Sequence, residues 1–336
     1  MTKTLGALLD DFGEFHAWLV QSQTSLWVLH AVSRTRLLDH LGDAPAPIET
    51  LAEKTGLKSD MLRRVMTFLA SQEVVYMDAE GRVAHTARSR AFHARQDAVR
   101  WLNVNFPAGL KFEEALRTGV ASFEHHYGQP LFDYLSERPD IAEEFGRLMS
   151  SITSAIEAFI FSEHQFKPFA RAVDIGGSHG QLMTRLLTEY PSAKGVIFDL
   201  PGTAAHARKA LASSPLKDRI EIIGGDFFKA VPDGGDLYLM KQILHDWGDE
   251  ECVAILKNIR AAIVPNGRLA VIDFLLPEKP APHPGYALDI NMLCLLTGGR
   301  ERKLSEFETL FARSGFALDR VTENPRGQSL IEAVPV

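Results

Sequence analysis

Residues 171–180 read Arg-Ala-Val-Asp-Ile-Gly-Gly-Ser-His-Gly, and this stretch decides the fold that we predict for the chain. A short apolar run leads into Asp174, and glycines follow directly before a helical pattern that begins near Gln181. Short, continuous apolar runs of this kind indicate parallel strands that are buried on both faces. The stretch therefore predicts the first strand of an α/β sheet, the glycine-rich turn after it and the helix that follows.

Four more apolar runs lead to reactive polar residues further along the chain. These residues are Asp199 after 195–198, Asp226 after 220–223, His245 after 237–240 and Asp273 after 269–272. Helical patterns separate the runs, as in a doubly wound sheet. Because ligands of such sheets bind outside the carboxyl ends of the strands, we expect these residues and Asp174 to line one crevice. Four acids and a histidine at one rim favour an enzyme that acts on a small molecule.

Composition limits the class of protein. The chain of 336 residues is long enough for two domains, and its 46% hydrophobic and 24% charged residues are typical of a soluble globular protein. A net charge of -7 disfavours a nucleic-acid binder. The two cysteines, Cys252 and Cys294, predict neither a disulfide framework nor a zinc site. With no signal-peptide pattern and no apolar run of roughly 18 residues, we expect a cytoplasmic protein that spans no membrane.

The first 100 residues predict a mainly helical domain with a winged-helix order. Apolar residues recur at helical spacing from Trp18 onward. Gly56 is placed to end a helix, Ser59 is placed to cap the next one, and residues 74–84 predict a hairpin. The second of these helices carries few basic residues, so we expect a structural or dimerising role rather than DNA binding.

The rest of the chain divides into two further parts. Residues 101–169 predict a helical linker that contributes to the substrate pocket, and Pro139 suits the first position of its last helix. Residues 170–336 predict the α/β domain with the crevice.

The glycine turn indicates what the crevice binds. Its order is Asp-x-Gly-Gly-x-x-Gly rather than the Gly-x-Gly-x-x-Gly of nicotinamide dinucleotide sites. Asp174 would repel a diphosphate but attract a cationic amino acid group. Asp199 lies where an acid grips a ribose diol, and Asp226 could accept from the exocyclic amine of adenine. The alternative is that Asp174 and Asp199 only cap the helices that follow them.

Five motifs occur in order and at the spacing of one known family. They are Asp174–Gly180, Phe198–Pro201, Gly225–Phe228, Lys241–Trp247 and Gly298–Arg302. With them the chain resembles the S-adenosylmethionine-dependent small-molecule O-methyltransferases, which include plant caffeate and flavonoid enzymes, acetylserotonin methyltransferase and bacterial phenazine and anthracycline enzymes. The resemblance covers nearly the whole chain. It implies a Rossmann-like class I methyltransferase sheet, an N-terminal winged-helix dimerisation domain, a homodimer and no metal.

The resemblance also implies which residues bind S-adenosyl-L-methionine. Gly176 would contact the methionine part, Thr153 its carboxylate and Asp199 the ribose. The adenine would contact Asp226 and Phe227, and Lys241 would lie close to the cofactor.

The glycine turn departs from the family at two positions. Ser178 stands where a third glycine is common, and we expect it to be tolerated if its φ is negative. His179 is expected to cover the cofactor or to cap the helix, without a chemical role.

The resemblance implies that His245 is the general base. Its ordinary pKa of about 6.5 lets it accept a proton at neutral pH. The alternative is a histidine that caps the helix beginning near Asp249. Two carboxylates match acidic positions of the family, Asp273 and Glu301, and either one would fix the tautomer of His245. We expect Glu301 to be the closer one, because the family often has the longer glutamate where Asp273 stands. Asp246 is expected to begin a helix.

Five apolar residues match positions that line the acceptor pocket of the family: Phe145, Met149, Ile152, Met292 and Leu295. Packing in the core is the alternative for each of them. An apolar slot suits a planar hydroxylated aromatic molecule such as a phenazine, a polyketide or a phenolic secondary metabolite. His125 and His126 are expected at the surface or at an interface, because adjacent residues point apart.

The leading hypothesis is therefore methyl transfer from S-adenosylmethionine to a hydroxyl of an aromatic metabolite. A second hypothesis keeps the fold and cofactor but has N-methylation, hydroxylation or decarboxylation as the reaction. A third is a ligand-sensing winged-helix regulator. The glycine order disfavours a fourth, a nicotinamide oxidoreductase.

Overall fold

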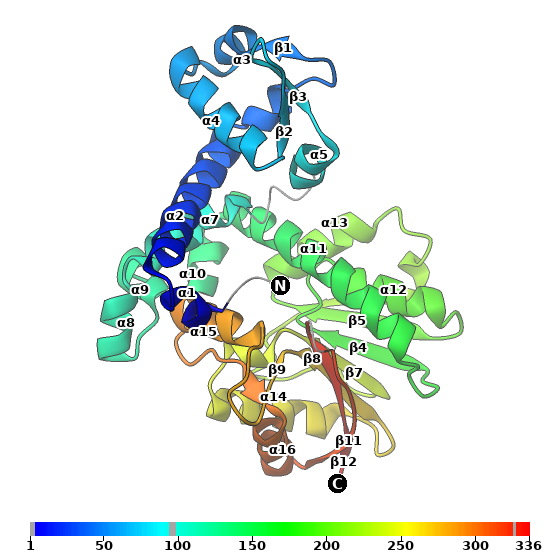
Figure 1. Ribbon diagram of the computed structural model, residues 1–336. Coiled ribbons are helices and arrows are strands. Elements are labelled where there is room, and N and C mark those ends of the chain that lie inside the picture. Colours follow the sequence, from blue (N-terminus) through cyan, green and yellow to red (C-terminus); the bar gives the residue numbers. More distant parts are fainter. Residues whose placement is uncertain (1–3, 94–98, 325–326) are drawn as a thin grey trace. The chain divides into compact units, whose positions relative to one another are not determined.

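The computed structural model describes residues 4–93, 99–324 and 327–336 (Figure 1). The chain divides into two compact units, Met1–Phe106 and Pro107–Val336. The division falls inside helix α7 (Leu102–Gly109), where a proline interrupts the helical hydrogen bonds. Each unit has a hydrophobic core of its own.

The first unit has the winged-helix order that the sequence predicts. A three-stranded sheet in the order β1-β3-β2 packs beside α3 and α4, and Gly56 ends α3 with a φ of 70°. The predicted hairpin is confirmed as β2 paired antiparallel with β3. The elements are α1 (Leu5–Leu9), α2 (Phe12–Arg34), η1 (Leu37–His40), β1 (Ala46–Pro47), α3 (Ile48–Thr55), α4 (Ser59–Ser71), β2 (Val75–Met77), β3 (Arg82–His85) and α5 (Ala87–His93).

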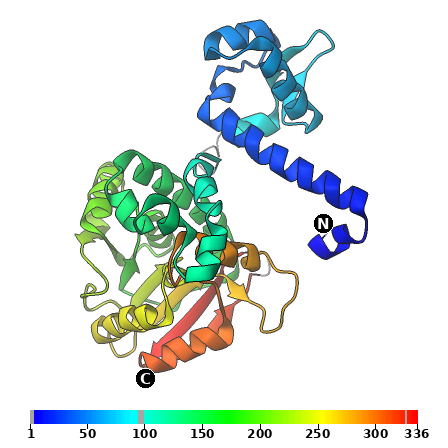
Figure 2. The ribbon, with the colours of Figure 1, turned by 90° about the vertical axis from the view of Figure 1, so that its left-hand side faces the viewer.

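One expectation for this unit is wrong, and one of its helices exposes many apolar side chains. The capping role of Ser59 is wrong, because Ser59 is already the first helical residue of α4 and Lys58 precedes it as an N-cap without a side-chain bond. Helix α2 is one long helix (Figure 2), and many of its large apolar residues are exposed to solvent.

The second unit is built on a seven-stranded sheet in the order β11-β12-β8-β7-β4-β5-β6. Five neighbouring strands are parallel, and they are the five that the sequence predicts. The fold class is thereby confirmed as an α/β sheet with a separate helical N-terminal unit. The strands are β4 (Arg171–Ile175), β5 (Lys194–Asp199), β6 (Ile220–Gly224), β7 (Leu237–Lys241), β8 (Arg268–Asp273), β11 (Phe316–Thr322) and β12 (Ser329–Pro335).

The last two strands run antiparallel, which the sequence analysis did not foresee. A parallel crossover needs about a dozen residues or more. Thr322 and Ser329 are too close in sequence for such a crossover, so β12 turns back on β11.

Apolar residues cover both faces of the sheet. Val173 and Val271 face the core under α14 and α16, whereas their neighbours Ala172 and Ile272 face the core under α11 and α12 (Figure 1). This double burial explains the continuous apolar runs in the sequence. The helices are α8 (Phe112–Thr118), α9 (Ser122–Tyr127), α10 (Leu131–Ser136), α11 (Pro139–Glu163), α12 (Gln181–Glu189), α13 (Pro201–Leu211), α14 (Asp249–Ala262), α15 (Gly285–Leu295) and α16 (Leu304–Arg313).

Short elements complete this unit. They are the 3-10 turns η2 (Lys217–Arg219) and η3 (Leu244–Asp246), and the two-residue strands β9 (Leu275–Leu276) and β10 (Arg302–Lys303). Pro139 occupies the first turn of α11, as predicted. Within the residues that the structure describes, none of the helices has the length and apolar character needed to cross a membrane.

The close packing of β5 against α12 gives a test of this fold. A Cβ atom on Gly195 would lie 2.2 Å from the sulfur of buried Met183, so Gly195→Ala should lower the free energy of unfolding by about 1–3 kcal/mol. Gly202 in α13 has open space at the same position, so Gly202→Ala should be neutral or slightly stabilising. Urea denaturation measures both, and equal stabilities would contradict the packing described.

Candidate active site

The carboxyl ends of the five parallel strands carry the polar residues that the sequence singles out. Asp174 is the second-last residue of β4, Asp199 ends β5 and Asp273 ends β8. Asp226 and His245 follow β6 and β7 after short connections. The structure therefore brings all five to one edge of the sheet, as expected.

His245 lies in the 3-10 turn η3 and is buried. Its Nδ1 atom is 2.7 Å from Oε1 of Glu301 and 3.9 Å from Oδ1 of Asp273. Glu301 is thus the carboxylate that contacts the ring directly, and the shorter Asp273 stays one atom further away. This geometry suits an imidazole whose tautomer is held by a carboxylate.

The helix-cap alternative for His245 does not describe this site. Helix α14 begins at Asp249, and its N-cap, Gly248, makes no side-chain cap bond. The expectation that Asp246 begins a helix is wrong as well, because Asp246 belongs to η3 and not to α14. Its Oδ1 atom lies 3.4 Å from Nε2 of His245, on the opposite side of the ring from Glu301.

Burial raises the pKa of every carboxyl around His245. Desolvation raises the pKa of Glu301 to about 8, with Asp289 adding to the effect and Arg302 opposing it. Desolvation likewise raises the pKa values of Asp246 and Asp273 to about 7, and the charge of His245 opposes it at both. No hydrogen-bond donor of the described chain reaches either carboxyl oxygen of Asp273. These groups therefore change protonation near neutral pH.

The trio of His245, Asp273 and Glu301 also offers ligand atoms within 4.8 Å of one another. Two ligands bound to one zinc ion at about 2.1 Å lie about 3 Å apart or more. The 2.7 Å separation of Nδ1 and Oε1 is shorter than this and has the length of a charge-assisted hydrogen bond. The geometry favours acid–base chemistry.

Residues 298–302 hold Glu301 in place through strand pairing. β10 pairs with β9 in parallel, with Arg302 opposite Leu275, just after the end of β8. The Glu301 amide donates to Oδ1 of Asp289 on α15. No role for Arg302 was predicted from the sequence, yet it is 1% exposed and bonded to the turn that carries His245. An arginine at the end of a glycine-rich motif was the only signal for it.

The glycine turn after β4 allows close approach of the backbone. Gly176 has a φ of 68°, and a Cβ atom there would lie 2.2 Å from Ile243. Ser178 does not meet the condition of a negative φ under which we expected it to be tolerated, because its φ is 48°. The left-handed conformation aims the Ser178 amide at Oδ2 of Asp199, 2.9 Å away.

The two acids of the nucleotide end differ in their partners. Asp199 accepts from the amides of Ser178 and Leu200, so local backbone bonds hold its carboxylate in place. Oδ2 of buried Asp174 meets no hydrogen-bond donor of the described chain, and desolvation raises its pKa to about 7. Lys241 lies nearby, and its charge opposes this rise. Asp174 therefore does not act as a helix cap.

Aromatic rings stand beside the third acid. Asp226 accepts from the Phe228 amide and pairs with Lys229 at 3.3 Å, so part of its accepting capacity serves its own turn. Phe227 meets Trp247 edge to face, with ring centroids 6.0 Å apart. Trp247, which follows η3, is a residue to which the sequence analysis assigned no role of its own.

Helix α11 contributes both a predicted and an unpredicted residue. The buried Thr153 hydroxyl donates to the Met149 carbonyl within the helix, which leaves its oxygen free to accept. Glu157, one turn later, has one buried oxygen without a donor among the described residues. Its pKa is raised by desolvation. No pattern in the sequence pointed to Glu157.

The five expected acceptor-pocket residues come from two helices. Phe145, Met149 and Ile152 lie on α11 and are partly buried, and Ile152 also packs on the core beneath α12. Met292 and Leu295 lie on α15 and are buried. The structure therefore places the residues in two clusters and leaves their contact with an acceptor as a prediction.

The remaining histidines singled out by the sequence have other surroundings. His179 packs on α11, where a Cβ atom on Gly146 would lie 2.5 Å from its ring. His125 and His126 are exposed on α9, and His125 is 2.7 Å from the Thr118 hydroxyl.

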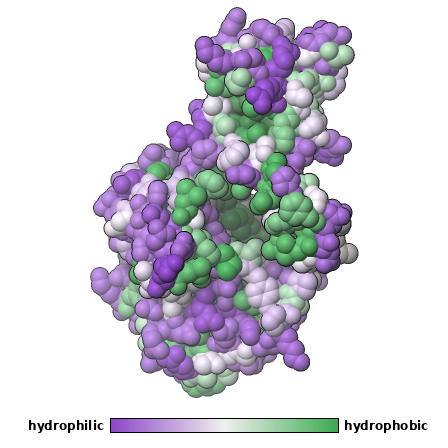
Figure 3. Space-filling view, turned by 60° about the vertical axis from the view of Figure 1, so that its left-hand side comes forward, coloured by the Kyte–Doolittle hydropathy of each residue, from purple (hydrophilic) through white to green (hydrophobic). Residues whose placement is uncertain are grey.

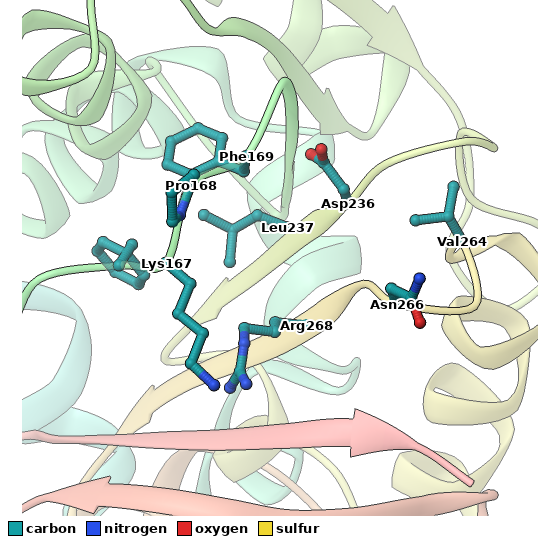
Figure 4. Close-up of a pocket in the computed structure, with 9 residues that line it drawn as sticks. Lys167, Pro168, Phe169, Asp236, Leu237, Val264, Asn266 and Arg268 are labelled. Carbon is teal, nitrogen blue, oxygen red and sulfur yellow. The ribbon is translucent and has the colours of Figure 1, made fainter.

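A cavity of about 410 Å³ opens at the opposite edge of the sheet (Figure 4). Its lining includes Leu237 and Arg268, which begin β7 and β8, and Lys167 from the segment before β4. Because the polar residues described above lie where the strands end, this cavity is separate from them.

Two protein-family models match the chain. A model described as an O-methyltransferase domain matches residues 110–317, and one described as an O-methyltransferase dimerisation domain matches residues 20–95. The phenazine O-methyltransferase PhzM of Lysobacter antibioticus is 36% identical over 327 residues, which are 95% of this chain and 96% of that protein.

Solved structures agree with this similarity. The crystal structure of LaPhzM has a TM-score of 0.91 at 33% identity and covers 97% of this chain and 100% of that chain. The O-methyltransferase NcsB1 from neocarzinostatin biosynthesis, in complex with S-adenosyl-L-homocysteine and 1,4-dihydroxy-2-naphthoic acid, has a TM-score of 0.78 at 26% identity. That match covers 93% of this chain and 96% of NcsB1.

The left-handed conformation of Ser178 can be tested by substitution. Ser178→Val should lower the free energy of unfolding by about 1–2 kcal/mol, because a β-branched residue is strained at positive φ. Ser178→Gly keeps the amide bond to Asp199 and should stay close to the wild type. If urea denaturation gives both variants the same midpoint, the conformation assigned to this turn is incorrect.

Proposed function

The chain belongs to the S-adenosylmethionine-dependent O-methyltransferase family, and on this premise we propose that it methylates a hydroxyl of a planar aromatic metabolite with His245 as general base. The proposal for the base rests on one observation, the 2.7 Å contact between Nδ1 of His245 and Glu301 in a buried turn. When Glu301 is ionised, its carboxylate only accepts hydrogen bonds, so Nδ1 carries the hydrogen and Nε2 keeps the lone pair for the acceptor hydroxyl.

The carboxylates then stabilise the charge that forms. When Nε2 takes a proton from the acceptor hydroxyl, the ring becomes an imidazolium between Glu301 on one side and Asp246 on the other. Asp273 adds a third acidic group 3.9 Å from Nδ1. We assign His245, Glu301 and Asp273 to this part of the reaction.

The residues present fit S-adenosyl-L-methionine. The buried oxygens of Asp174 and Glu157 that lack a donor within the described chain are acceptors for an ammonium group. We propose that Gly176 contacts the methionine part, that Asp199, whose carboxylate the Ser178 amide binds, holds the ribose, and that Phe227 contacts the adenine. When bound, the cofactor supplies a methyl group on a sulfonium, which is already an activated leaving group. We keep Thr153, Lys241 and Asp226 in this cofactor set.

Apolar side chains and the relatives both support an aromatic acceptor. We propose that Phe145, Met149, Ile152, Met292 and Leu295 form an apolar slot for an aromatic ring. Figure 3 shows that hydrophobic residues gather on one face of the molecule. PhzM is named for a phenazine, and NcsB1 is in complex with a dihydroxynaphthoic acid, so both relatives pair this family with fused aromatic molecules.

Two alternatives from the sequence analysis predict different outcomes. N-methylation also transfers one methyl group but needs less help from a base, whereas hydroxylation or decarboxylation changes the product mass differently. Product mass and the effect of losing His245 separate these reactions. A DNA-binding regulator is disfavoured by α4, where Arg63 already pairs with Glu49 at 2.7 Å. We therefore propose a function without nucleic acid.

We also propose that two copies associate through the first unit and that residues 101–169 link it to the cofactor domain and line the acceptor pocket. The dimerisation-domain match and the exposed apolar residues on α1 and α2 support the dimer. We further propose a reducing, cytoplasmic location, which the free thiols of Cys252 and Cys294 support.

The dimer can be tested with a charge on the exposed face of α2. Trp27 is 56% exposed, and Trp27→Glu should shift the mass measured by sedimentation from that of a dimer toward that of a monomer. Tyr76 on β2 is 47% exposed and provides a control, since Tyr76→Glu should leave the mass unchanged. A wild-type chain that sediments as a monomer would refute the proposal.

The base can be tested by removing the imidazole. His245→Ala should lower the rate of methylation by about 10²–10⁴-fold and leave the affinity for S-adenosylmethionine within about twofold. The assay uses cofactor with a labelled methyl group and a screen of hydroxylated phenazines, naphthoic acids and simple phenols. His125→Ala on the exposed side of α9 is the control and should keep the wild-type rate. Full activity of His245→Ala would exclude this base.

A further inference from the structure

Arg302 is among the largest side chains that are fully buried in the described part of the chain. Its guanidinium donates to the carbonyls of Leu244 and Trp247, both at 2.8 Å. It also pairs with Asp249 at the start of α14, where Nη2 and Oδ1 are 2.7 Å apart. Three protein acceptors therefore hold the guanidinium, and none of them is an acidic residue next to His245.

The two carbonyls flank His245 on either side. η3 has only three residues, and its own backbone bonds are 3.3 Å for Trp247 N to Leu244 O and 3.1 Å for Asp246 N to Ile243 O. A turn this short leaves most of its carbonyls without helical partners. Arg302 donates to the Leu244 and Trp247 carbonyls at 2.8 Å, closer than the Cys252 thiol, which donates to the same two carbonyls at 3.2 and 3.5 Å. The Arg300 amide donates to the His245 carbonyl at 2.8 Å.

Residues 300–302 thus contact the backbone of His245, its ring and the backbone on either side of it. The amide of Arg300 binds its carbonyl, the carboxylate of Glu301 contacts its ring, and the guanidinium of Arg302 binds the carbonyls before and after it. The fork geometry of an arginine suits two separate carbonyls, which a lysine cannot bind in the same way.

We propose that Arg302 is the positioning residue of the base, fixing the turn that aims His245 and placing a positive charge beside Glu301. This inference rests on the proposed function. Arg302 touches neither acceptor nor cofactor in this assignment, so it acts only through the turn and through the acidic groups next to it.

The charge of Arg302 also acts on the carboxyl groups beside His245. The charge of Arg302 lowers the pKa values of Glu301 and Asp273, against the desolvation that raises them. A protonated Glu301 would donate to Nδ1 and move the imidazole hydrogen to Nε2, where it blocks the base. The ionisable groups that face Glu301 are His245 and Asp246 from η3, Asp273 from β8, Asp289 from α15 and Arg302 from β10.

Two variants of Arg302 separate its effect on the position of the turn from the effect of its charge. Arg302→Met removes both the fork and the charge, and Arg302→Lys keeps the charge without the fork. Arg219→Met is the matched control, because Arg219 also donates to backbone carbonyls, those of Leu187, Tyr190 and Ala193, at the opposite end of the strands. Loss of Arg219 should reduce stability alone.

Activity and its pH dependence give the first readout. Arg302→Met should lower kcat about 100-fold, with cofactor affinity within about threefold. The wild-type rate should rise with pH as Glu301 loses its proton. The midpoint of this rise should lie near the pKa of Glu301, which is about 8. This midpoint should move to higher pH in Arg302→Met and stay in place in Arg302→Lys, whose kcat should fall about tenfold. Arg219→Met should keep both the wild-type kcat and the midpoint.

Nitrogen NMR of labelled histidine gives a second readout that needs no acceptor. At pH 9 the His245 ring should carry its hydrogen on Nδ1 in the wild type and in Arg219→Met, and should show averaged tautomers in Arg302→Met. This result would stand even if no acceptor were methylated, which separates it from failure of the proposed function. If Arg302→Met does not fold, Arg302→Lys carries the test.

The inference is overturned by either of two results. One is an Arg302 variant with wild-type kcat, midpoint and tautomer. The other is a loss of activity in proportion to the folded fraction, with the same pattern in Arg219→Met.

Discussion

Five parallel strands end at one edge of the sheet, and the chemistry proposed for this chain depends on that shared edge. Both faces of the sheet are filled by apolar residues, so a polar side chain on these strands has room only where a strand ends. Asp174, Asp199 and Asp273 occupy such positions, and His245 follows one turn beyond β7. The packing that stabilises the fold therefore also gathers the reactive groups.

Gathering acids in a buried crevice has an electrostatic cost that the structure offsets only in part. Desolvation raises the pKa values of Asp174, Asp246 and Asp273 to about 7. Lys241 and Arg302 supply positive charge from within the protein, and the remaining excess of acidic groups suits a cationic ligand. An ammonium and a sulfonium on one molecule fit this excess, whereas a diphosphate does not.

The segment 298–302 shows how a short motif far along the chain completes the crevice. It pairs with β9 beside the end of β8, and its polar groups reach both the ring and the backbone of His245. A base in a three-residue turn lacks the rigidity of a helix or strand, so its geometry has to come from neighbouring segments. The glycines before Glu301 allow that close approach, since a Cβ on Gly299 would lie 3.2 Å from the His245 carbonyl.

By itself the sequence determined the strand order along the chain, the edge at which Asp174, His245 and Asp273 meet, and the separate helical unit, because apolar periodicity and turn glycines are local signals. Local signals did not extend to contacts between distant segments. Only the tertiary structure decided that Asp246 faces Nε2 of His245 and that Ser178 is left-handed. The role of Arg302 and the antiparallel return of β12 belong to the same group, since each depends on which segments pack together in space.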